Sequence, residues 1–244
     1  MLERISEKIS SSSSEFKIYS SIKDTKSLVV VENIEKIKQF LRCSFEYVLD
    51  SIIDPNVRGF VANECYLAGG CIRNFIIGKP INDLDLFFKK KEYINEFKNL
   101  IDNRYNVPVF VSDIKIVANT INAVTCLNRN TIIRPFQFIT KPGRAGNPID
   151  VVYNTFDFTN CMGWYDPAQD ELEISKMLEA LNSGKLVYNL NSTNPLNSIK
   201  RLIKFQKMGF EVTEQCLFDM FKQSKELTHE DEFRRYKFDR KANY

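Results

Sequence analysis

The chain has 244 residues, a formal net charge of +3 and a hydrophobic fraction of 43%. This length fits one large domain or two small ones, and the apolar fraction is sufficient for a buried core. A net charge this close to zero does not by itself indicate a nucleic-acid-binding protein. Because His229 is the only histidine, histidine-based triads and multi-histidine metal sites are excluded.

No apolar run reaches the roughly eighteen residues that a membrane-spanning helix requires. The N-terminus also lacks the apolar core of a signal peptide. The six cysteines are scattered singly without a Cys-x-x-Cys pair, and several lie in apolar stretches, so we expect free buried thiols. We therefore predict a cytoplasmic protein that does not cross a membrane.

Residues 1–31 are weakly patterned and contain a run of serines, which indicates an N-terminal extension. Residues 32–54 carry apolar side chains at spacings of three and four. This pattern predicts an amphipathic helix that ends at Pro55.

Residues 65–78 predict a strand, a tight turn and a helix. The first four form an apolar run that is typical of a buried strand. Gly69 and Gly70 allow the backbone to turn sharply, and helical spacing follows from Cys71 until Gly78 ends the helix.

A second strand follows, with aspartates at alternate positions. Side chains i and i+2 of a strand point to the same face, so Asp83 and Asp85 should lie side by side while Leu84 and Leu86 enter the core. Two adjacent carboxylates repel each other, and a site that keeps both usually holds a hard divalent cation.

The remaining chain alternates further strand and helix patterns. Strands are predicted over 107–111, 114–118, 123–127, 131–140, 148–153 and 186–188, and helices over 92–102, 171–184, 194–210 and 213–227. A loop rich in Gly and Pro, residues 141–148, precedes the strand predicted at 148–153, on which Asp150 should point away from the core. The tail is dense in charges and aromatic residues.

The Gly-Gly-x-x-Arg element followed by Asp-x-Asp resembles the nucleotidyltransferases of the DNA polymerase beta superfamily. It is most similar to the head of bacterial-type CCA-adding enzymes and poly(A) polymerases. Gly69, Gly70, Arg73 and the aspartates keep the family's spacing, whereas Asn74 replaces the Asp that follows the Arg in the family. The resemblance implies an α/β (α+β) fold, a head with a short mixed sheet flanked by helices and a small helical neck.

The implied domain division follows the resemblance along the chain. The head would span residues 32–166 and the neck-like region 167–228, between the extension at 1–31 and the charged tail at 229–244.

The resemblance also implies Mg²⁺-dependent transfer of a nucleoside monophosphate from a nucleoside triphosphate such as ATP, with release of pyrophosphate. Asp83, Asp85 and Asp150 would hold two Mg²⁺ ions. Asp150 is assigned because the family places its third carboxylate on a strand beside the Asp-x-Asp strand. Gly69, Gly70 and Arg73 would hold the triphosphate.

Residues 154–166 resemble a second nucleotide-binding element of the family. Thr155 and Phe156 replace its two arginines, which removes two charge-assisted phosphate contacts. Asp157 either contacts the nucleotide or caps the helix that this element begins. Asn160 stands where the family has Ile.

The helix predicted at 194–210 resembles the family's neck helix. Asn194 and Asn197 stand where the family selects the base, and their amides can still bond to a base edge. Four cations follow at spacings of three and four, Lys200, Arg201, Lys204 and Lys207. They form either a solvated face or a phosphate-contacting face toward RNA.

The implied acceptor is the 3′ end of an RNA, such as a tRNA. CCA-adding enzymes continue into domains that hold tRNA, so we expect a partner protein or a homo-oligomer to supply that contact here. Two alternatives remain: transfer to a protein side chain, or a catalytically degenerate head that serves as a binding module.

Overall fold

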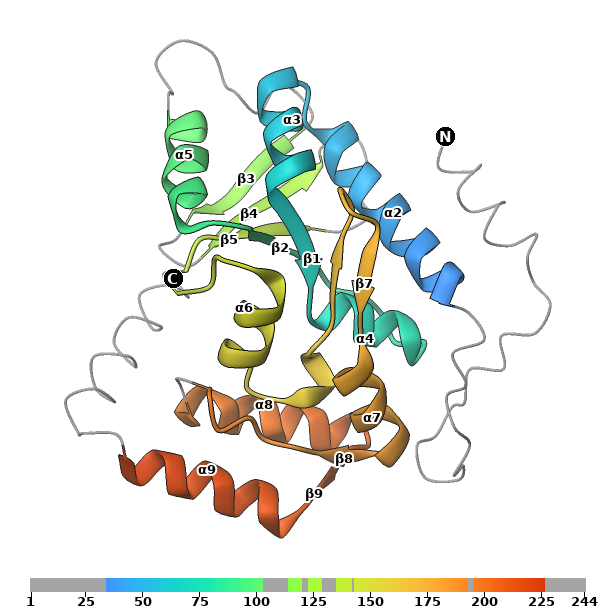
Figure 1. Ribbon diagram of the computed structural model, residues 1–244, viewed down its shortest axis with the longest axis vertical. Coiled ribbons are helices and arrows are strands. Elements are labelled where there is room, and N and C mark those ends of the chain that lie inside the picture. The colour runs from blue at the N-terminus through green and yellow to red at the C-terminus, as the bar shows by residue number, and fades with distance from the viewer. Residues whose placement is uncertain are drawn as a thin grey trace.

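The computed structural model describes residues 34–102, 114–119, 123–128, 135–141, 143–192 and 195–226. Within them a seven-stranded mixed sheet has the order β3-β4-β5-β2-β1-β6-β7, and helices flank it (Figure 1). The predicted mixed α/β fold is confirmed.

The elements follow the predicted alternation closely in most places. The described helices are α2 (Ile34–Ser51), α3 (Pro55–Glu64), α4 (Gly70–Ile76), α5 (Lys91–Asp102), α6 (Pro148–Thr155), α7 (Ser175–Ser183), α8 (Pro195–Lys207) and α9 (Glu214–Glu226), with a 3-10 turn, η1 (Thr159–Cys161). The strands are β1 (Cys65–Ala68), β2 (Leu84–Phe88), β3 (Ile114–Asn119), β4 (Ala123–Asn128), β5 (Phe136–Ile139), β6 (Trp164–Asp166), β7 (Glu171–Glu173), β8 (Lys185–Leu186) and β9 (Glu211–Val212).

β2 lies at the centre of the sheet. It runs antiparallel to β1, with Leu67 opposite Leu86, and parallel to β5, with Asp85 opposite Gln137. Because strand side chains alternate, the two faces of the sheet pack against different groups of residues.

The first face of the sheet packs on α2, α3 and α5. Leu67, Leu84 and Leu86 are buried there with residues such as Leu41 and Phe45 of α2. This cluster is the larger of the two described cores, and it fixes the register of β2, because a slip by one residue would turn its leucines away from this core and turn Asp85 into it.

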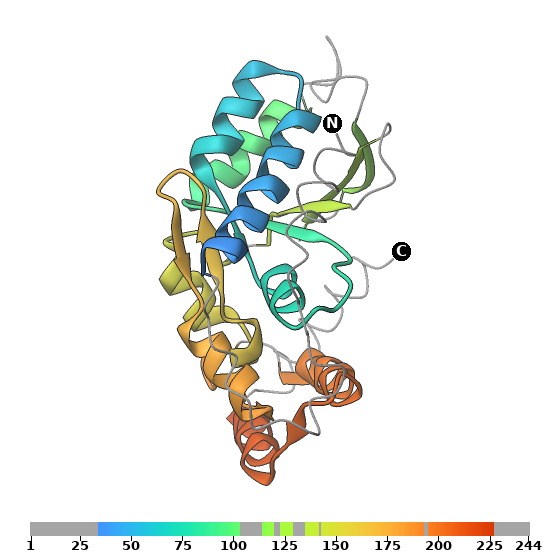
Figure 2. The same cartoon turned by 90° about the vertical axis from the view of Figure 1, so that its right-hand side faces the viewer.

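The second face carries Tyr66 and Phe87, which pack with Val151 and Val152 of α6 and with Phe205 of α8. Figures 1 and 2 show the sheet between two groups of helices, α2, α3 and α5 at one end and α7, α8 and α9 at the other. Asp85 alternates with Leu84 and Leu86, so it belongs to this second face.

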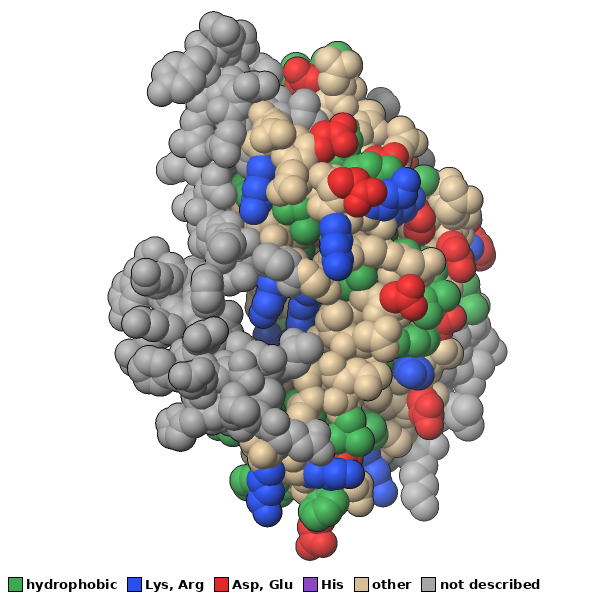
Figure 3. Space-filling model, turned by 60° about the vertical axis from the view of Figure 1, so that its left-hand side comes forward, with side chains coloured by type: hydrophobic (Ala, Val, Ile, Leu, Met, Phe, Trp, Pro, Cys, Tyr) green, Lys and Arg blue, Asp and Glu red, His purple; other side chains and the backbone are tan. Residues whose placement is uncertain are grey.

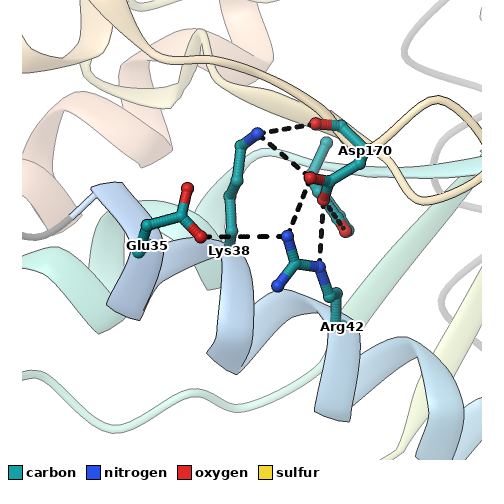
Figure 4. A network of polar contacts seen from close by, with 5 residues as sticks. Glu35, Lys38, Arg42 and Asp170 are labelled. Carbon is teal, nitrogen blue, oxygen red and sulfur yellow. Dashed lines mark hydrogen bonds and ion pairs between the residues drawn. The ribbon is translucent and has the colours of Figure 1, made fainter.

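A polar clamp joins α2 to the turn between β6 and β7 (Figure 4). Arg42 donates to both carboxylate oxygens of Asp170, at 3.0 and 2.7 Å, and Lys38 forms an ion pair with the same carboxylate at 3.3 Å. The Tyr165 hydroxyl donates to it at 2.9 Å. Asp170 has φ 51, a left-handed conformation that Asp tolerates better than most residues.

Three predictions of secondary structure are wrong. Pro55 does not end the first helix, which ends at Ser51; it is the first residue of α3, and Asp54 caps that helix by accepting from two backbone amides. The predicted strand at 148–153 is helix α6. Residues 171–173 form β7, so the helix predicted from 171 begins at Ser175.

Some predictions lie outside the described residues: the extension, the tail, the strand at 107–111 and the beginning of the one at 131–140. Five cysteines, Cys65, Cys71, Cys126, Cys161 and Cys216, are buried free thiols as expected. No helix within the described residues is both long enough and apolar enough to span a membrane.

Candidate nucleotide-binding site

The Gly69-Gly70 turn joins β1 to α4 as predicted. Gly69 has a backbone φ of 90, which residues other than glycine rarely adopt. Its amide donates a hydrogen bond to Gly163 O at 2.9 Å. A Cβ at Gly69 would lie 3.3 Å from the Phe156 ring, and one at Gly70 would lie 3.4 Å from the Arg73 guanidinium. The turn is therefore tightly enclosed by Phe156 and Arg73.

Asp83 directly precedes β2 and Asp85 lies within it, so the two carboxylates are neighbours at the start of this strand. Asp85 is half-buried. Burial, and secondly the negative charge of Asp83, raise the pKa of Asp85 to about 7. The two carboxylates are thus close enough to repel each other, as the spacing predicted.

Three cations act against that repulsion. The positive charges of Arg201, Arg144 and Lys204 oppose the rise in the pKa of Asp85. Arg201 and Lys204 come from α8, and Arg144 from the loop between β5 and α6. The fold therefore brings two separate parts of the chain, α8 and the β5–α6 loop, to the carboxylate pair.

Arg73 is buried, with 3% of its surface exposed, and its orientation is fixed. Nε and Nη2 donate to the Asn74 side-chain oxygen at 3.0 and 2.8 Å, and Asn74 in turn donates to Pro80 O. Nη1 donates to the Cys161 sulfur at 2.9 Å. Asn74, which replaces an Asp of the resembled family, thus holds Arg73 beside the glycine turn.

Asp157 links the sheet side of the molecule to α8. Its carboxylate forms an ion pair with Arg201 Nη1 at 2.8 Å and accepts from the Ser198 hydroxyl at 3.2 Å. The cap residue of η1 is Phe158, without a side-chain cap bond, so the alternative that Asp157 caps a helix is wrong. Asp157 instead positions Arg201, whose Nη2 also donates to Cys161 at 3.4 Å.

The prediction that Asp150 joins the carboxylate pair Asp83 and Asp85 is wrong. It is exposed in the first turn of α6, not on a strand. The neighbours of β2 are β1 and β5, and the residue opposite Asp85 on β5 is Gln137. Within the described part of the chain, no group of three or more His, Cys, Asp or Glu side chains could hold a metal ion.

The three asparagines predicted to bind the nucleotide do not all lie in one place. Asn160 is fully buried in η1, and neither amide atom has a hydrogen-bond partner among the described residues. Asn197 is half-buried on α8, close in sequence to Ser198 and Arg201. Asn194 lies outside the described residues.

Arg144 is the functional candidate that the sequence did not reveal, since it lies in a loop without a motif. Arg201 was identified only as part of a basic helix face. Figure 3 shows Lys and Arg side chains lining a hollow on one face of the molecule. Cationic residues distant in sequence can be found only from the fold.

These features combine a mixed α/β fold with an enclosed glycine turn, two neighbouring carboxylates and several arginine side chains. Among solved structures, the chain is similar to a tRNA-processing enzyme in its apo form, with 13% identity and a TM-score of 0.47 over 72% of this chain and 46% of that one. It is also similar to the Thermotoga maritima CCA-adding enzyme complexed with tRNA-CCA, with 15% identity and a TM-score of 0.45 over 74% and 45%.

The chain belongs to the Gabija anti-defense 2 family, whose model matches residues 35–184. It is 23% identical over 158 residues to "Gabija anti-defense 2" of Bacillus phage SPbetaL7. That match includes 64% of this chain and 36% of the phage protein, so the chain spans only a minor part of its relative's length. The sequence motifs alone did not indicate this family.

Proposed function

We propose that the chain transfers a nucleoside monophosphate from a nucleoside triphosphate to a hydroxyl group. The observation that carries this proposal is that the positive charges of Arg144, Arg201 and Lys204 act on Asp85, the neighbour of Asp83, while Phe156 and Arg73 enclose the Gly69-Gly70 turn. Carboxylates suit Mg²⁺ and guanidinium groups suit phosphate. A site with both fits a Mg²⁺-bound triphosphate.

The residues fit one Mg²⁺ better than the two predicted from the resemblance. Mg²⁺ is commonly held by one or two carboxylates together with substrate phosphates and water, which Asp83 and Asp85 can provide. The Asp150 carboxylate is exposed on α6 and is not part of this pair. When bound, the ion would polarise the phosphate oxygens and neutralise their charge.

The proposed transfer needs no reactant other than the nucleoside triphosphate and the acceptor hydroxyl. The acceptor oxygen forms a bond to the α-phosphorus, the bond from that phosphorus to the bridging oxygen breaks, and pyrophosphate leaves with the bonding electrons. The acceptor's proton passes to solvent or to a basic oxygen of the site. The chain's contribution is to orient the phosphates and hold their charge.

We further propose that the acceptor is an RNA 3′-hydroxyl. Lys200, Lys204 and Lys207 are exposed on α8, the helix that also supplies Arg201 to the site. Exposed lysines next to a transfer site suit an approaching phosphate backbone.

Membership of the Gabija anti-defense 2 family is the basis for proposing what the transfer does in the cell. We propose that the transfer counteracts the Gabija defence. Phage plating on Gabija-carrying cells, with the wild type or Asp83→Ala/Asp85→Ala supplied in trans, tests this. Equal rescue by both proteins would show that the role does not need the carboxylates.

The direct test is a labelling assay. Purified protein is mixed with Mg²⁺, total RNA and each α-labelled nucleoside triphosphate in turn, beside Asp83→Ala/Asp85→Ala. We expect label in RNA only with the native carboxylates, and Asp150→Ala should retain activity because Asp150 is exposed on α6. The Asp150 variant is therefore a matched carboxylate control.

Each other outcome contradicts part of the proposal. Label in a protein band would replace RNA by a protein side chain as the acceptor. Absence of label together with absence of nucleotide binding would leave the catalytically degenerate binding module. Loss of activity in Asp150→Ala would restore the three-carboxylate site predicted from the resemblance.

A further inference from the structure

Arg144 lies where the sequence lacks its expected arginines. Thr155 and Phe156 replace two arginines of the resembled family, and Arg144 reaches back from its loop onto both residues. Its Nη2 donates to Thr155 O at 3.0 Å, and its guanidinium carbon lies 5.1 Å from the centre of the Phe156 ring. The same ring touches the space beside Gly69, so Arg144 is fixed close to the glycine turn.

Arg201 approaches the same place from α8. Its guanidinium is held by Asp157 at 2.8 Å and lies 5.7 Å from the centre of the Phe205 ring. The Arg73 guanidinium lies 4.9 Å from the same ring. Two arginines from different elements therefore share one aromatic support and one sulfur acceptor, Cys161.

We propose that Arg144 and Arg201 form a clamp for the β- and γ-phosphates of the nucleoside triphosphate, in place of the two arginines missing at Thr155 and Phe156. This inference rests on the proposed function. It assigns phosphate binding to two positions that the family motifs do not contain, one in a loop and one on the helix α8.

The charge balance of the site favours a polyanion. Arg73, Arg144, Arg201 and Lys204 outnumber the carboxylates Asp83, Asp85 and Asp157 among the described side chains here. Burial and the charge of Arg201 lower the pKa of Arg144, so the two guanidinium groups repel each other. A Mg²⁺ ion on the aspartates would increase the positive excess, and a triphosphate would neutralise it.

The test compares inorganic tripolyphosphate with a nucleoside monophosphate as titrants in calorimetry, with Mg²⁺ present. We expect Arg144→Gln to weaken tripolyphosphate binding about tenfold or more, because a charge-assisted contact is lost, and to leave monophosphate binding within about twofold. Lys222→Gln is the matched control, because Lys222 lies exposed on α9 and should change neither affinity.

Arg201 needs a paired variant because its loss would leave the buried Asp157 without its ion-pair partner. Arg201→Gln/Asp157→Asn keeps a neutral hydrogen-bonding pair in place. If the clamp is correct, this double variant binds tripolyphosphate about tenfold more weakly than Asp157→Asn alone, which keeps the Arg201 guanidinium. Thermal melts of each variant check that the fold is retained.

The clamp and the proposed function can fail separately. Carboxylate-dependent labelling of an acceptor with unchanged tripolyphosphate affinity in the arginine variants would overturn the clamp and leave the transfer reaction. Loss of tripolyphosphate affinity in a protein that labels nothing would support the clamp and overturn the reaction. Equal weakening by Lys222→Gln would indicate general electrostatic attraction and overturn the clamp.

Discussion

Asp85 carries a cost in stability that its site explains. Its carboxylate is half-buried and faces a second carboxylate, and both effects favour its neutral form. Residues arranged for ligand binding often destabilise the free protein in this way. The cost should disappear when the charge is removed.

We predict that Asp85→Asn increases the free energy of unfolding at neutral pH by roughly 1 kcal/mol, because the amide has nearly the same shape and no charge. The same variant should lose Mg²⁺ binding. Urea denaturation in EDTA measures the first effect and calorimetry with Mg²⁺ the second. A destabilised variant would show that Asp85 is held in place by its charge rather than despite it.

Gly69 is required by backbone geometry. An alanine there would need φ near 90, and its Cβ would press on the Phe156 ring at 3.3 Å. We predict that Gly69→Ala lowers the free energy of unfolding by about 2 kcal/mol. It should also weaken triphosphate binding because it displaces the turn.

Gly59→Ala is the control for this change. Gly59 lies in α3, and a Cβ there would meet nothing within 4 Å. Alanine should stabilise the helix by about 0.5–1 kcal/mol. Urea denaturation of both variants therefore gives opposite signs, and equal signs would contradict the assignment of Gly69 as a strained turn.

Among single residues, the sequence predicted those candidate site residues that lie close together along the chain. Gly69, Arg73, Asp83 and Asp85 lie within one short segment, and its elements α4 and β2 contact each other in the structure. Arg144 could not be predicted because its role depends on a loop that folds back onto Thr155. No periodicity records such a contact.

Among the secondary-structure elements, α6 shows why a prediction failed. Residues 148–153 include Ile149, Val151 and Val152, whose branched side chains favour strands. The decisive signal was the start of the segment: the Asn147 side chain accepts from the Ile149 amide, and Pro148 occupies the first helical position. Because the sequence predicts a strand here instead of a helix, it also wrongly predicts that Asp150 lies beside Asp83 and Asp85 as a third metal-binding carboxylate.

The polar clamp at Asp170, which joins α2 to the β6–β7 turn, gives a prediction about how the stability of the protein depends on pH. Hydrogen bonds from Arg42, Tyr165 and Lys38 hold the pKa of Asp170 well below its usual value of 3.8. The folded protein thus binds this proton more weakly than the unfolded chain. The stabilisation by the clamp is complete above about pH 4 and is lost as the pH falls further.

We predict that Asp170→Asn lowers the melting temperature at pH 7, since the amide can keep the left-handed turn but not the ion pairs. The difference from the wild type should narrow below about pH 4, and it should shrink in high salt because these side chains are partly exposed. Melting curves from pH 2 to 7 check this. Asp50→Asn, an exposed change on α2, should leave the pH profile unchanged.

On the scale of the whole molecule, the sheet and the C-terminal helices share a core. The second cluster joins Tyr66 and Phe87 of the sheet to Phe205 of α8 and Met220 of α9. The sequence predicted a head and a neck with a boundary near residue 166, and this division stays a prediction. The periodicity of each helix showed its apolar face, but not that the two regions would bury those faces together.

Phe205 connects this core to the candidate site. Only 1% of its surface is exposed, and its ring centre lies 5.4 Å from that of Phe158. The guanidinium groups of Arg73 and Arg201 lie over the Phe205 ring. We predict that Phe205→Ala lowers the free energy of unfolding by about 3 kcal/mol through the cavity it leaves. Under conditions where it remains folded, it should also bind tripolyphosphate more weakly because Arg201 loses its support.

Phe221→Ala tests the same substitution on the other side of the helical region. Phe221 is 66% exposed on α9, so we expect a change in stability within about 0.5 kcal/mol and unchanged tripolyphosphate affinity. Urea denaturation and calorimetry on both variants distinguish two arrangements. If Phe205→Ala destabilises the protein but leaves phosphate affinity intact, the helices only complete the core; if both fall together, the helices also form part of the site.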